Sequence, residues 1–129
     1  MNTAKVALVT GGGSGLGLAI AQKFTEAGIV TIIAGRDKNK LDAAQETIGE
    51  LCHARVCDLN DLKSIPKFVQ QLLSEFGHID ILVNNAGINM KKEFTEVTDE
   101  DFLSVINTNV VAVFALSREV VRQMLPRES

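Results

Sequence analysis

Several features that mark specialised protein classes are scarce or absent in this sequence. There are two cysteines, Cys52 and Cys57, and neither has a nearby pair of metal-ligand partners, so we expect reduced, partly buried thiols and no metal site. The longest unbroken apolar run, Val110 to Leu116, is far shorter than the roughly 20 residues that span a bilayer. The N-terminal residues lack the charged leader and apolar core of a signal peptide. These absences predict a cytoplasmic protein with no membrane partner.

Clustered positive charge is absent as well. The formal net charge is -3, the calculated pI is about 5.3, and Lys91-Lys92 is the only adjacent pair of basic residues. This balance argues against a nucleic-acid partner. A solvated loop accounts for the lysine pair better than a binding patch does.

The composition is that of one globular domain. The chain has 129 residues, of which 46% are hydrophobic and 22% charged, which is enough to bury a sizeable core. No internal repeat, low-complexity tract or linker divides it. We therefore predict a single domain over residues 1–129.

The most informative stretch is a glycine-rich segment, residues 10–17, with the sequence Thr-Gly-Gly-Gly-Ser-Gly-Leu-Gly. An apolar run precedes it and a helical pattern follows, so its backbone N–H groups should lie at a helix N-terminus, where unpaired donors and the helix dipole favour a phosphate. The glycine spacing, Gly11-x-x-x-Gly15-x-Gly17, differs from the G-x-G-x-x-G dinucleotide fingerprint. By itself the segment is therefore also compatible with a flexible turn between a strand and a helix.

Strand-like and helical patterns alternate four times along the chain. Strands are expected at residues 5–10, 29–34, 54–57 and 80–84, and helices at 14–27, 38–51, 62–76 and 101–125. Short connections of this kind indicate an α/β fold, a Rossmann-like doubly wound parallel sheet with right-handed crossovers. Ligands of such sheets bind beyond the carboxyl ends of the strands. The glycine-rich segment, Arg36, Asp58 and residues 84–87 all follow strands, so they should converge on one crevice.

The end of the second strand bears on the choice of cofactor. An acidic side chain there selects NAD by binding the ribose hydroxyls, whereas an arginine accommodates the 2′-phosphate of NADP. Gly35 occupies the expected acidic position and Arg36 follows it, which favours NADP(H) over NAD(H). Asp37 is the counter-argument, because a shift of one residue would place its carboxylate at the ribose. We prefer to interpret Asp37 as the N-cap of the next helix.

Taken together, four motifs resemble the classical short-chain dehydrogenase/reductase family. They are Thr10-Gly11-x-x-x-Gly15-Leu16-Gly17, Asp58-Leu59, Asn84-Asn85-Ala86-Gly87 and Asn109-Val110. The resemblance covers the whole chain. It implies hydride transfer between a nicotinamide cofactor and the carbonyl or alcohol carbon of a small molecule.

The resemblance also implies roles for individual residues. The glycine loop would hold the pyrophosphate, Asp58 the adenine amino group, and the segment after the fourth strand the adenosine-side ribose. With Arg36, the implied cofactor-binding residues are Thr10, Gly11, Gly13, Ser14, Gly15, Leu16, Gly17, Asp58, Leu59, Asn84, Ala86 and Gly87. Asn109 matches the family's catalytic asparagine, which helps to order a proton-relay water, although a locally satisfied helix residue is the plainer interpretation. We assign no role to Asn107 and expect Asn85 to bridge strand ends.

The sequence departs from the family at the catalytic centre. The family's chemistry needs a serine that holds the substrate oxygen and a Tyr-x-x-x-Lys pair, and this chain contains no tyrosine. We therefore expect the N-terminal half of a longer reductase, which would not turn over alone because it lacks a proton donor of matched pKa. The alternatives are a non-catalytic NADP(H)-binding or partner-modulating module, or an unstable remnant.

Two further expectations concern partners and substrate. The wide apolar surface of the helix at residues 101–125 suits a homo-oligomer, since that helix builds the subunit interface in the family, and the fourth strand would be an exposed apolar edge. Residues 85–89 and 98–102 look similar to bacterial sugar-acid dehydrogenases, with 3-oxoacyl carrier-protein reductases close behind. The substrate itself cannot be deduced from these segments.

Overall fold

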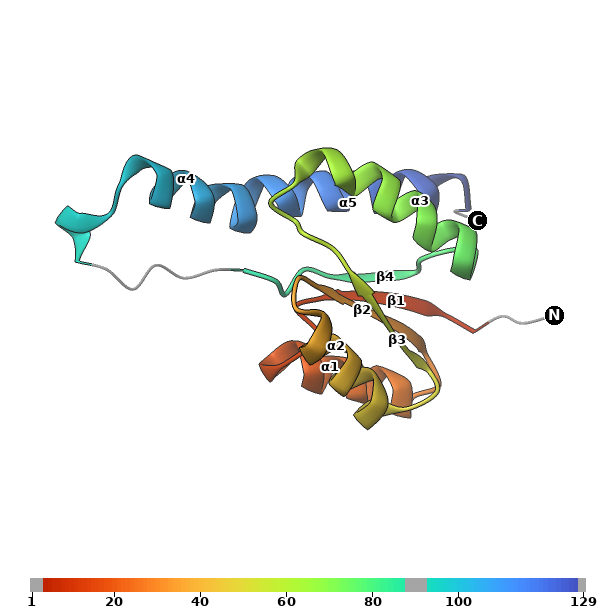
Figure 1. Cartoon of the computed structure of the whole chain (residues 1–129). Coiled ribbons are helices and arrows are strands. Elements are labelled where there is room, and N and C mark those ends of the chain that lie inside the picture. Colours follow the sequence, from red (N-terminus) through yellow and green to blue (C-terminus); the bar gives the residue numbers. More distant parts are fainter. Residues whose placement is uncertain (1–3, 88–92, 128–129) are drawn as a thin grey trace.

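The chain folds into a four-stranded parallel sheet covered by helices on both faces (Figure 1). The structure is a computed structural model and describes residues 4–87 and 93–127. In chain order the elements are β1 (Val6–Thr10), α1 (Gly15–Glu26), β2 (Val30–Gly35), α2 (Lys38–Ile48), β3 (Cys52–Val56), α3 (Ile65–Phe76), β4 (Ile81–Val83), α4 (Asp99–Ile106) and α5 (Ala112–Met124). The predicted fold class is confirmed. Lys91-Lys92 and residues 88–89 lie outside the described residues.

The strand order β3-β2-β1-β4 places the first strand in the middle of the sheet. β1 pairs in parallel with β2, where Thr10 is level with Ala34, and with β4, where Val9 is level with Val83. β2 continues the register to β3, where Gly35 is level with Val56. The carboxyl ends of all four strands therefore lie along the same edge of the sheet, where ligands of such sheets bind. β4 lies at one side of the sheet, as expected.

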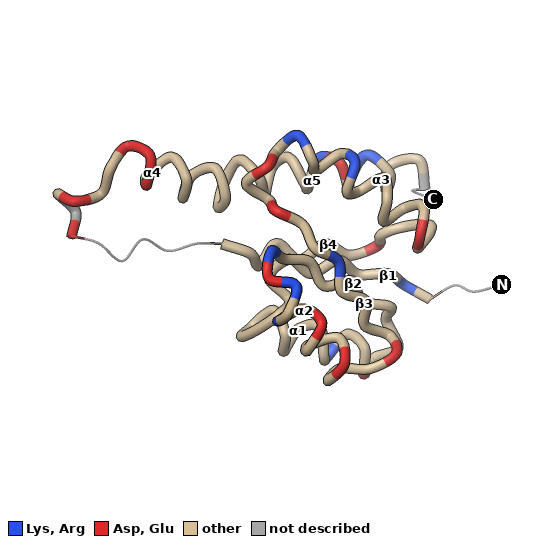
Figure 2. Tube along the Cα trace, in the orientation of Figure 1, with Lys and Arg blue, Asp and Glu red and all other residues tan. Residues whose placement is uncertain are grey.

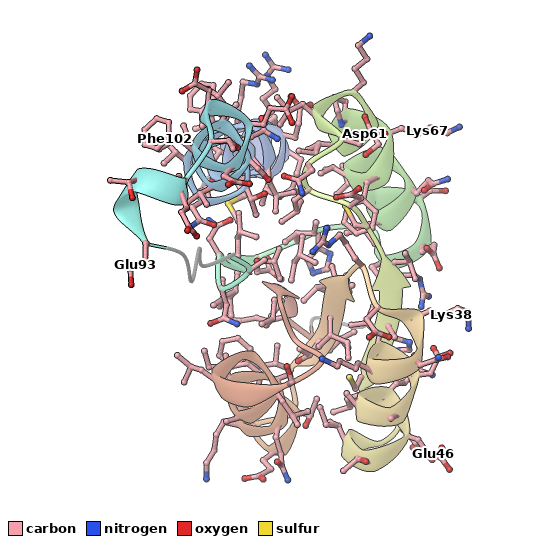
Figure 3. All side chains as sticks on the ribbon, turned by 60° about the vertical axis from the view of Figure 1, so that its left-hand side comes forward. Lys38, Glu46, Asp61, Lys67, Glu93 and Phe102 are labelled. Carbon is pink, nitrogen blue, oxygen red and sulfur yellow. The ribbon has the colours of Figure 1, made fainter. Side chains whose placement is uncertain are left out.

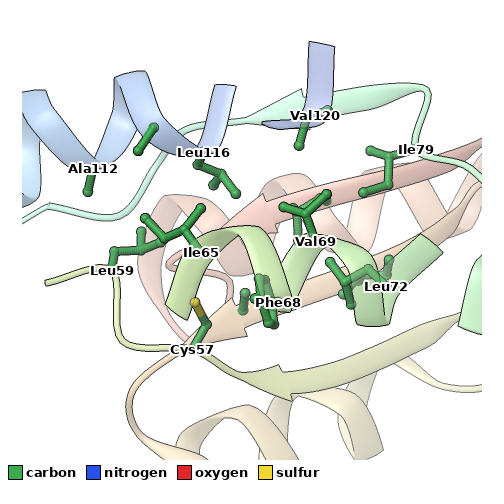
Figure 4. Close-up of a cluster of buried hydrophobic side chains, with 14 of the residues drawn as sticks. Cys57, Leu59, Ile65, Phe68, Val69, Leu72, Ile79, Ala112, Leu116 and Val120 are labelled. Atoms are coloured by element: carbon green, nitrogen blue, oxygen red, sulfur yellow. The ribbon is translucent and has the colours of Figure 1, made fainter. Parts of the chain in front are cut away.

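The sheet separates two apolar clusters. On one face, α1 and α2 pack against Ile33 and Cys52 of the sheet, with Ala21, Leu41 and Ala44 buried between them. On the other face, α3 and α5 form the larger cluster, in which Ile65, Val69, Leu72, Leu116 and Val120 are almost fully buried (Figure 4). Continuous apolar strands such as β1, whose residues are all buried, are typical of a sheet covered on both faces.

Several element boundaries differ from expectation for local reasons. α2 ends at Ile48 rather than residue 51, because Gly49 adopts φ of +112° and terminates the helix. β3 begins at Cys52, two residues earlier than predicted, so this cysteine lies inside the strand rather than before it. The helix expected at residues 62–76 opens with a 3₁₀ turn, Leu62–Ser64, before α3 begins, and Pro66 lies in its first turn as predicted.

The last helix is continuous but not uniform. It begins at Asp99, where Thr98 and Asp101 form a reciprocal capping box, with 3.0 Å between the Asp101 backbone nitrogen and Thr98 Oγ1. Acidic residues gather at this outer end (Figure 2), which complements the helix dipole. Between α4 and α5 the segment Asn107–Val111 is π-helical, a feature that the sequence pattern did not predict.

By length and composition alone, the helix from Asp99 to Met124 could cross a membrane. Unbroken apolar runs in the sequence do not reveal this property, because polar residues interrupt the segment. Ala112, Ala115, Leu116 and Val120 are buried in the cluster with α3. Core helices of globular domains meet the same two criteria, so this single helix is weak evidence for a membrane span.

Candidate functional site

A cavity of about 300 Å³ opens at the carboxyl edge of the sheet. It is lined by residues 34–36, 57–60 and 85–87, together with Gly11, Ser14 and Thr108. These residues come from the end of β2, from the turns after the strands and from the helix that follows β4. Of the predicted motifs, Gly11, Ser14, Arg36, Asp58 and residues 85–87 meet at this one cavity.

The glycine loop forms the wall next to α1. Gly11 and Gly15 have φ angles of +66° and +57°, a backbone conformation that L side chains rarely adopt. Ser14 caps α1 with an extended backbone but makes no side-chain bond to the first turn. The N–H groups of that turn are therefore left for other acceptors, which is the arrangement that binds phosphate groups in proteins.

Thr10 joins the glycine loop to the turn after β4. Its side chain is buried, and its Oγ1 accepts the backbone N–H groups of Asn85 and Ala86, both at 3.0 Å, while donating to the Val83 carbonyl at 3.4 Å. Asn85 Nδ2 donates to the Gly11 carbonyl oxygen at 3.2 Å, which confirms the expectation that Asn85 bridges strand ends. Thr10 therefore lies behind the cavity wall, and its implied contact with a cofactor stays a prediction.

At the end of β2, the cavity wall contains a positively charged side chain, that of Arg36. Arg36 is exposed and lines both this cavity and a neighbouring hollow of about 140 Å³, whose walls also include Gly13 and Lys40. Asp37 Oδ1 accepts the Lys40 backbone N–H at 3.1 Å, so the N-cap interpretation of Asp37 is confirmed. One oxygen of this carboxylate therefore caps the first turn of α2, and Asp37 also lines the 140 Å³ hollow.

The wall after β3 contains Asp58, which is exposed, and Leu59, which is buried. Asp58 Oδ1 accepts the Asn60 backbone N–H at 2.9 Å, which shapes the turn. Cys57 precedes them as a free, buried thiol. Burial raises its pKa to about 11, with smaller contributions from the carboxylates of Asp58 and Asp61. Cys57 is thus an uncharged part of the wall at neutral pH.

Some predicted residues lie away from the cavity lining. Asn84 Nδ2 donates to Ser117 Oγ on α5 at 3.2 Å. Asn109 lies in the π-helical segment with its carboxamide against Gly87, where a Cβ built on that glycine would be 3.1 Å from Asn109 Oδ1. Also outside the lining of this cavity are Thr10, Gly13, Gly15, Leu16 and Gly17. Their implied roles remain predictions.

Six residues of the cavity lining were not among the predicted site residues: Ala34, Gly35, Cys57, Asn60, Asn85 and Thr108. Thr108 Oγ1 donates to Asn60 Oδ1, and Asn107, which was given no role, donates from Nδ2 to the Asn60 carbonyl oxygen at 3.2 Å. Asn60 follows the Asp58-Leu59 motif directly, and this adjacency was the available signal. No pattern in the sequence indicates that Asn60 contacts Asn107 and Thr108, which lie 47 and 48 positions away. Among the described residues, no group of three His, Cys, Asp or Glu side chains could hold a metal ion.

A family model described as short chain dehydrogenase matches residues 5–129, which is almost the whole chain. The chain belongs to this family. The glycine loop, the Asp58-Leu59 turn and the Asn85–Gly87 turn thus surround the cavity of a short-chain dehydrogenase fold.

Individual family members match at similar levels. Gluconate 5-dehydrogenase from Gluconobacter oxydans is 36% identical over 124 residues, covering 94% of this chain and 48% of the relative. A crystal structure of 3-ketoacyl-(acyl-carrier-protein) reductase from Brucella melitensis, complexed with NADH, has a TM-score of 0.86 and 36% identity, covering 92% of this chain and 49% of that one. A variant of actinorhodin polyketide ketoreductase with NADPH has a TM-score of 0.91 and 33% identity, covering 98% and 51%. The chain spans about half the length of the relatives that it matches.

Proposed function

We propose that this chain is the dinucleotide-binding half of an NAD(P)-dependent short-chain oxidoreductase, which transfers hydride between nicotinamide and a carbonyl or alcohol carbon of a small molecule. The observation that supports this most directly is the cavity at the carboxyl edge of the sheet, bounded by a glycine loop at the N-terminus of α1. Two related structures were determined with NADH and with NADPH.

The residues of the cavity fit a dinucleotide. Positive φ angles at Gly11 and Gly15 shape a loop whose backbone a pyrophosphate can approach closely. Gly87 lines the cavity beside the Asn109 carboxamide, where a side chain would press against Asn109 Oδ1. Asp58 is exposed at the rim and carries a carboxylate that can accept the adenine amino group. A bound nicotinamide dinucleotide would supply the hydride.

Within this site we assign NADP(H) as the preferred form. Arg36 and Lys40 contribute two cations to the 140 Å³ hollow beside the main cavity, and a guanidinium binds phosphate oxygens with charge-assisted hydrogen bonds. Asp37 is the carboxylate that could otherwise accept ribose hydroxyls, but its Oδ1 caps α2 through the Lys40 N–H. The charges at this end of β2 therefore favour a 2′-phosphate over a free ribose.

Asn109 is the one member of the family's catalytic tetrad that the resemblance assigns to this chain. Its carboxamide, held beside Gly87, would orient a proton-relay water. The serine, tyrosine and lysine of the family pattern have no counterpart in the 129 residues, which contain no tyrosine. We therefore propose that substrate binding and proton transfer need residues beyond these.

The same family resemblance supports association of two copies through the last helix. Phe102, Leu103, Val110, Phe114 and Val121 are large apolar residues with more than two fifths of their surface exposed. Phe102 lies on the side of α4 that faces away from the sheet (Figure 3). Sedimentation velocity on the purified chain tests this proposal, and a monomer at all concentrations would contradict it.

The test of the cofactor proposal is titration of the purified chain with NADPH and with NADH, followed by calorimetry. We expect both to bind and NADPH to bind at least about tenfold more tightly, as one strong charge-assisted contact allows. If neither nucleotide bound, the dinucleotide site would be refuted, and tighter binding of NADH would refute the preference. A cofactor-dependent turnover by the 129-residue chain alone would refute the assignment of proton transfer to other residues.

A further inference from the structure

Asn60 links two distant parts of the chain at the back of the cavity. Its Oδ1 accepts Thr108 Oγ1 and, at 3.3 Å, Asn107 Nδ2, and its carbonyl oxygen accepts the same Nδ2 at 3.2 Å. Asn60 belongs to the turn after β3, whereas Asn107 and Thr108 belong to the π-helical segment between α4 and α5. These three hydrogen bonds are named here the Asn60 bridge.

Two of the three residues of the Asn60 bridge line the cavity, and the third, Asn107, is half-buried and directly precedes Thr108 in sequence. Thr108 is only 6% exposed, and both Asn60 and Thr108 line the cavity. Leu59, Ile65 and Ala112 belong to one apolar cluster (Figure 4). Hydrogen bonds in such partly dry surroundings are stronger than exposed ones and hold their partners in a defined geometry.

The π-helical geometry of residues 107–111 determines which way the neighbouring side chains of the Asn60 bridge and Asn109 face. A π turn accommodates one more residue than an α turn, and such segments are frequent at functional sites. Here it allows Asn107 and Thr108 to face Asn60 while Asn109 lies against Gly87, a residue of the opposite cavity wall. The segment that carries Asn109 is therefore held from two sides, and both contacts involve residues that line the nucleotide cavity.

We propose that Asn60, Asn107 and Thr108 are positioning residues, which fix the π-helical segment so that nucleotide in the cavity orders Asn109. This inference rests on the proposed dinucleotide site. Bound nucleotide would contact Thr108 and the turn that contains Asn60, and would restrict their motion. The Asn60 bridge would pass this restriction on to Asn109 and the rest of the π-helical segment. A bridge that only stabilises the fold would change stability without changing this response.

The test measures hydrogen–deuterium exchange of the purified chain, with and without NADPH at a concentration that saturates each variant. In the unmodified chain, we expect NADPH to slow exchange at residues 107–111 at least about fivefold, the lower end of common coupling strengths. Thr108→Val, which removes the hydroxyl but keeps the shape, and Asn60→Ala should abolish this protection while the glycine loop remains protected. Thr108→Ser keeps a hydroxyl and should restore it.

Thr25→Val is the matched control, because Thr25 Oγ1 donates only to the Gln22 carbonyl within α1 among the hydrogen bonds described for it, at 2.9 Å. It should leave the NADPH response at residues 107–111 unchanged. The inference is overturned if NADPH binds but leaves these residues unprotected, if Thr108→Val responds like the unmodified chain, or if Thr108→Ser responds like Thr108→Val. Absence of NADPH binding to the unmodified chain is a different result: it refutes the proposed dinucleotide site and this inference with it.

Discussion

Gly17 packs its α-carbon directly against the carbonyl oxygen of Gly11, so that a methyl group on Gly17 would overlap that oxygen. The same methyl group would lie 2.6 Å from Asn85 Nδ2, which donates to the Gly11 carbonyl. The helix α1, the glycine loop and the turn after β4 therefore meet at a point where there is no space for a side chain. Glycine at position 17 is required by packing, independently of any ligand.

Gly17→Ala should consequently move the loop. We expect a loss of about 1–3 kcal/mol in the free energy of unfolding, as for other overpacked sites, together with loss of NADPH binding. Gly28→Ala is the control: Gly28 has φ of +83° with open space around its α-carbon, and it lies at the far end of α1. It should lower stability by about 1 kcal/mol through backbone strain and leave binding unchanged. Urea denaturation and calorimetry measure both quantities; unaltered binding by Gly17→Ala would contradict the packing argument.

Thr10→Val should detach the turn after β4 from the glycine loop. The backbone N–H groups of Asn85 and Ala86 would lose their shared acceptor, Thr10 Oγ1, and a buried donor left without a partner costs about 1–3 kcal/mol. We expect reduced stability in urea denaturation and weaker NADPH binding. Thr10→Ser keeps the oxygen and should recover most of both. Equal losses in the two variants would contradict the argument that the hydroxyl alone accounts for the role of Thr10.

Arg36→Gln should affect the binding of the two cofactors differently. We expect NADPH to bind roughly tenfold or more weakly, because a charge-assisted contact to the 2′-phosphate is lost, while NADH binding changes little. Lys38→Gln removes the same charge from the same turn, but Lys38 pairs with Asp42 at 2.6 Å and lines neither hollow. It should leave the preference intact. A parallel loss of NADPH and NADH binding by Arg36→Gln would contradict a role at the 2′-phosphate.

The two buried thiols should make the fold sensitive to alkaline pH. Burial raises the pKa of both Cys52 and Cys57 from 9.0 to about 11. Above pH 9 the unfolded chain releases these protons while the folded chain retains them, so stability should fall as pH rises from 9 towards 11 and be unaffected by them below pH 9. The pair Cys52→Ala with Cys57→Ala should show a smaller decline in urea denaturation across this window. An identical decline would assign the effect to other groups.

Much of the site could be predicted because its residues are arranged by local rules. The strand, glycine loop and helix at residues 6–26 follow from hydrophobic pattern and glycine spacing, and the parallel sheet brings every strand's carboxyl end to one edge. Asp37 as an N-cap was also predictable, since its side chain bonds a backbone group three residues away. The predicted end of α2 and the predicted start of β3 were wrong, because Gly49 ends the helix early and only a short connection separates it from the strand.

The sequence by itself determined the α/β fold, the edge at which the motifs gather, and the family to which the chain belongs. Only the tertiary structure decided how individual side chains point: Thr10 behind the loop, Asn84 towards Ser117, and Asn60 towards Thr108. The physical reason is the range of the interactions. Hydrophobic period and capping act over a few residues, whereas these hydrogen bonds join residues 33 to 75 positions apart. Such bonds form only once the helices and the sheet have packed.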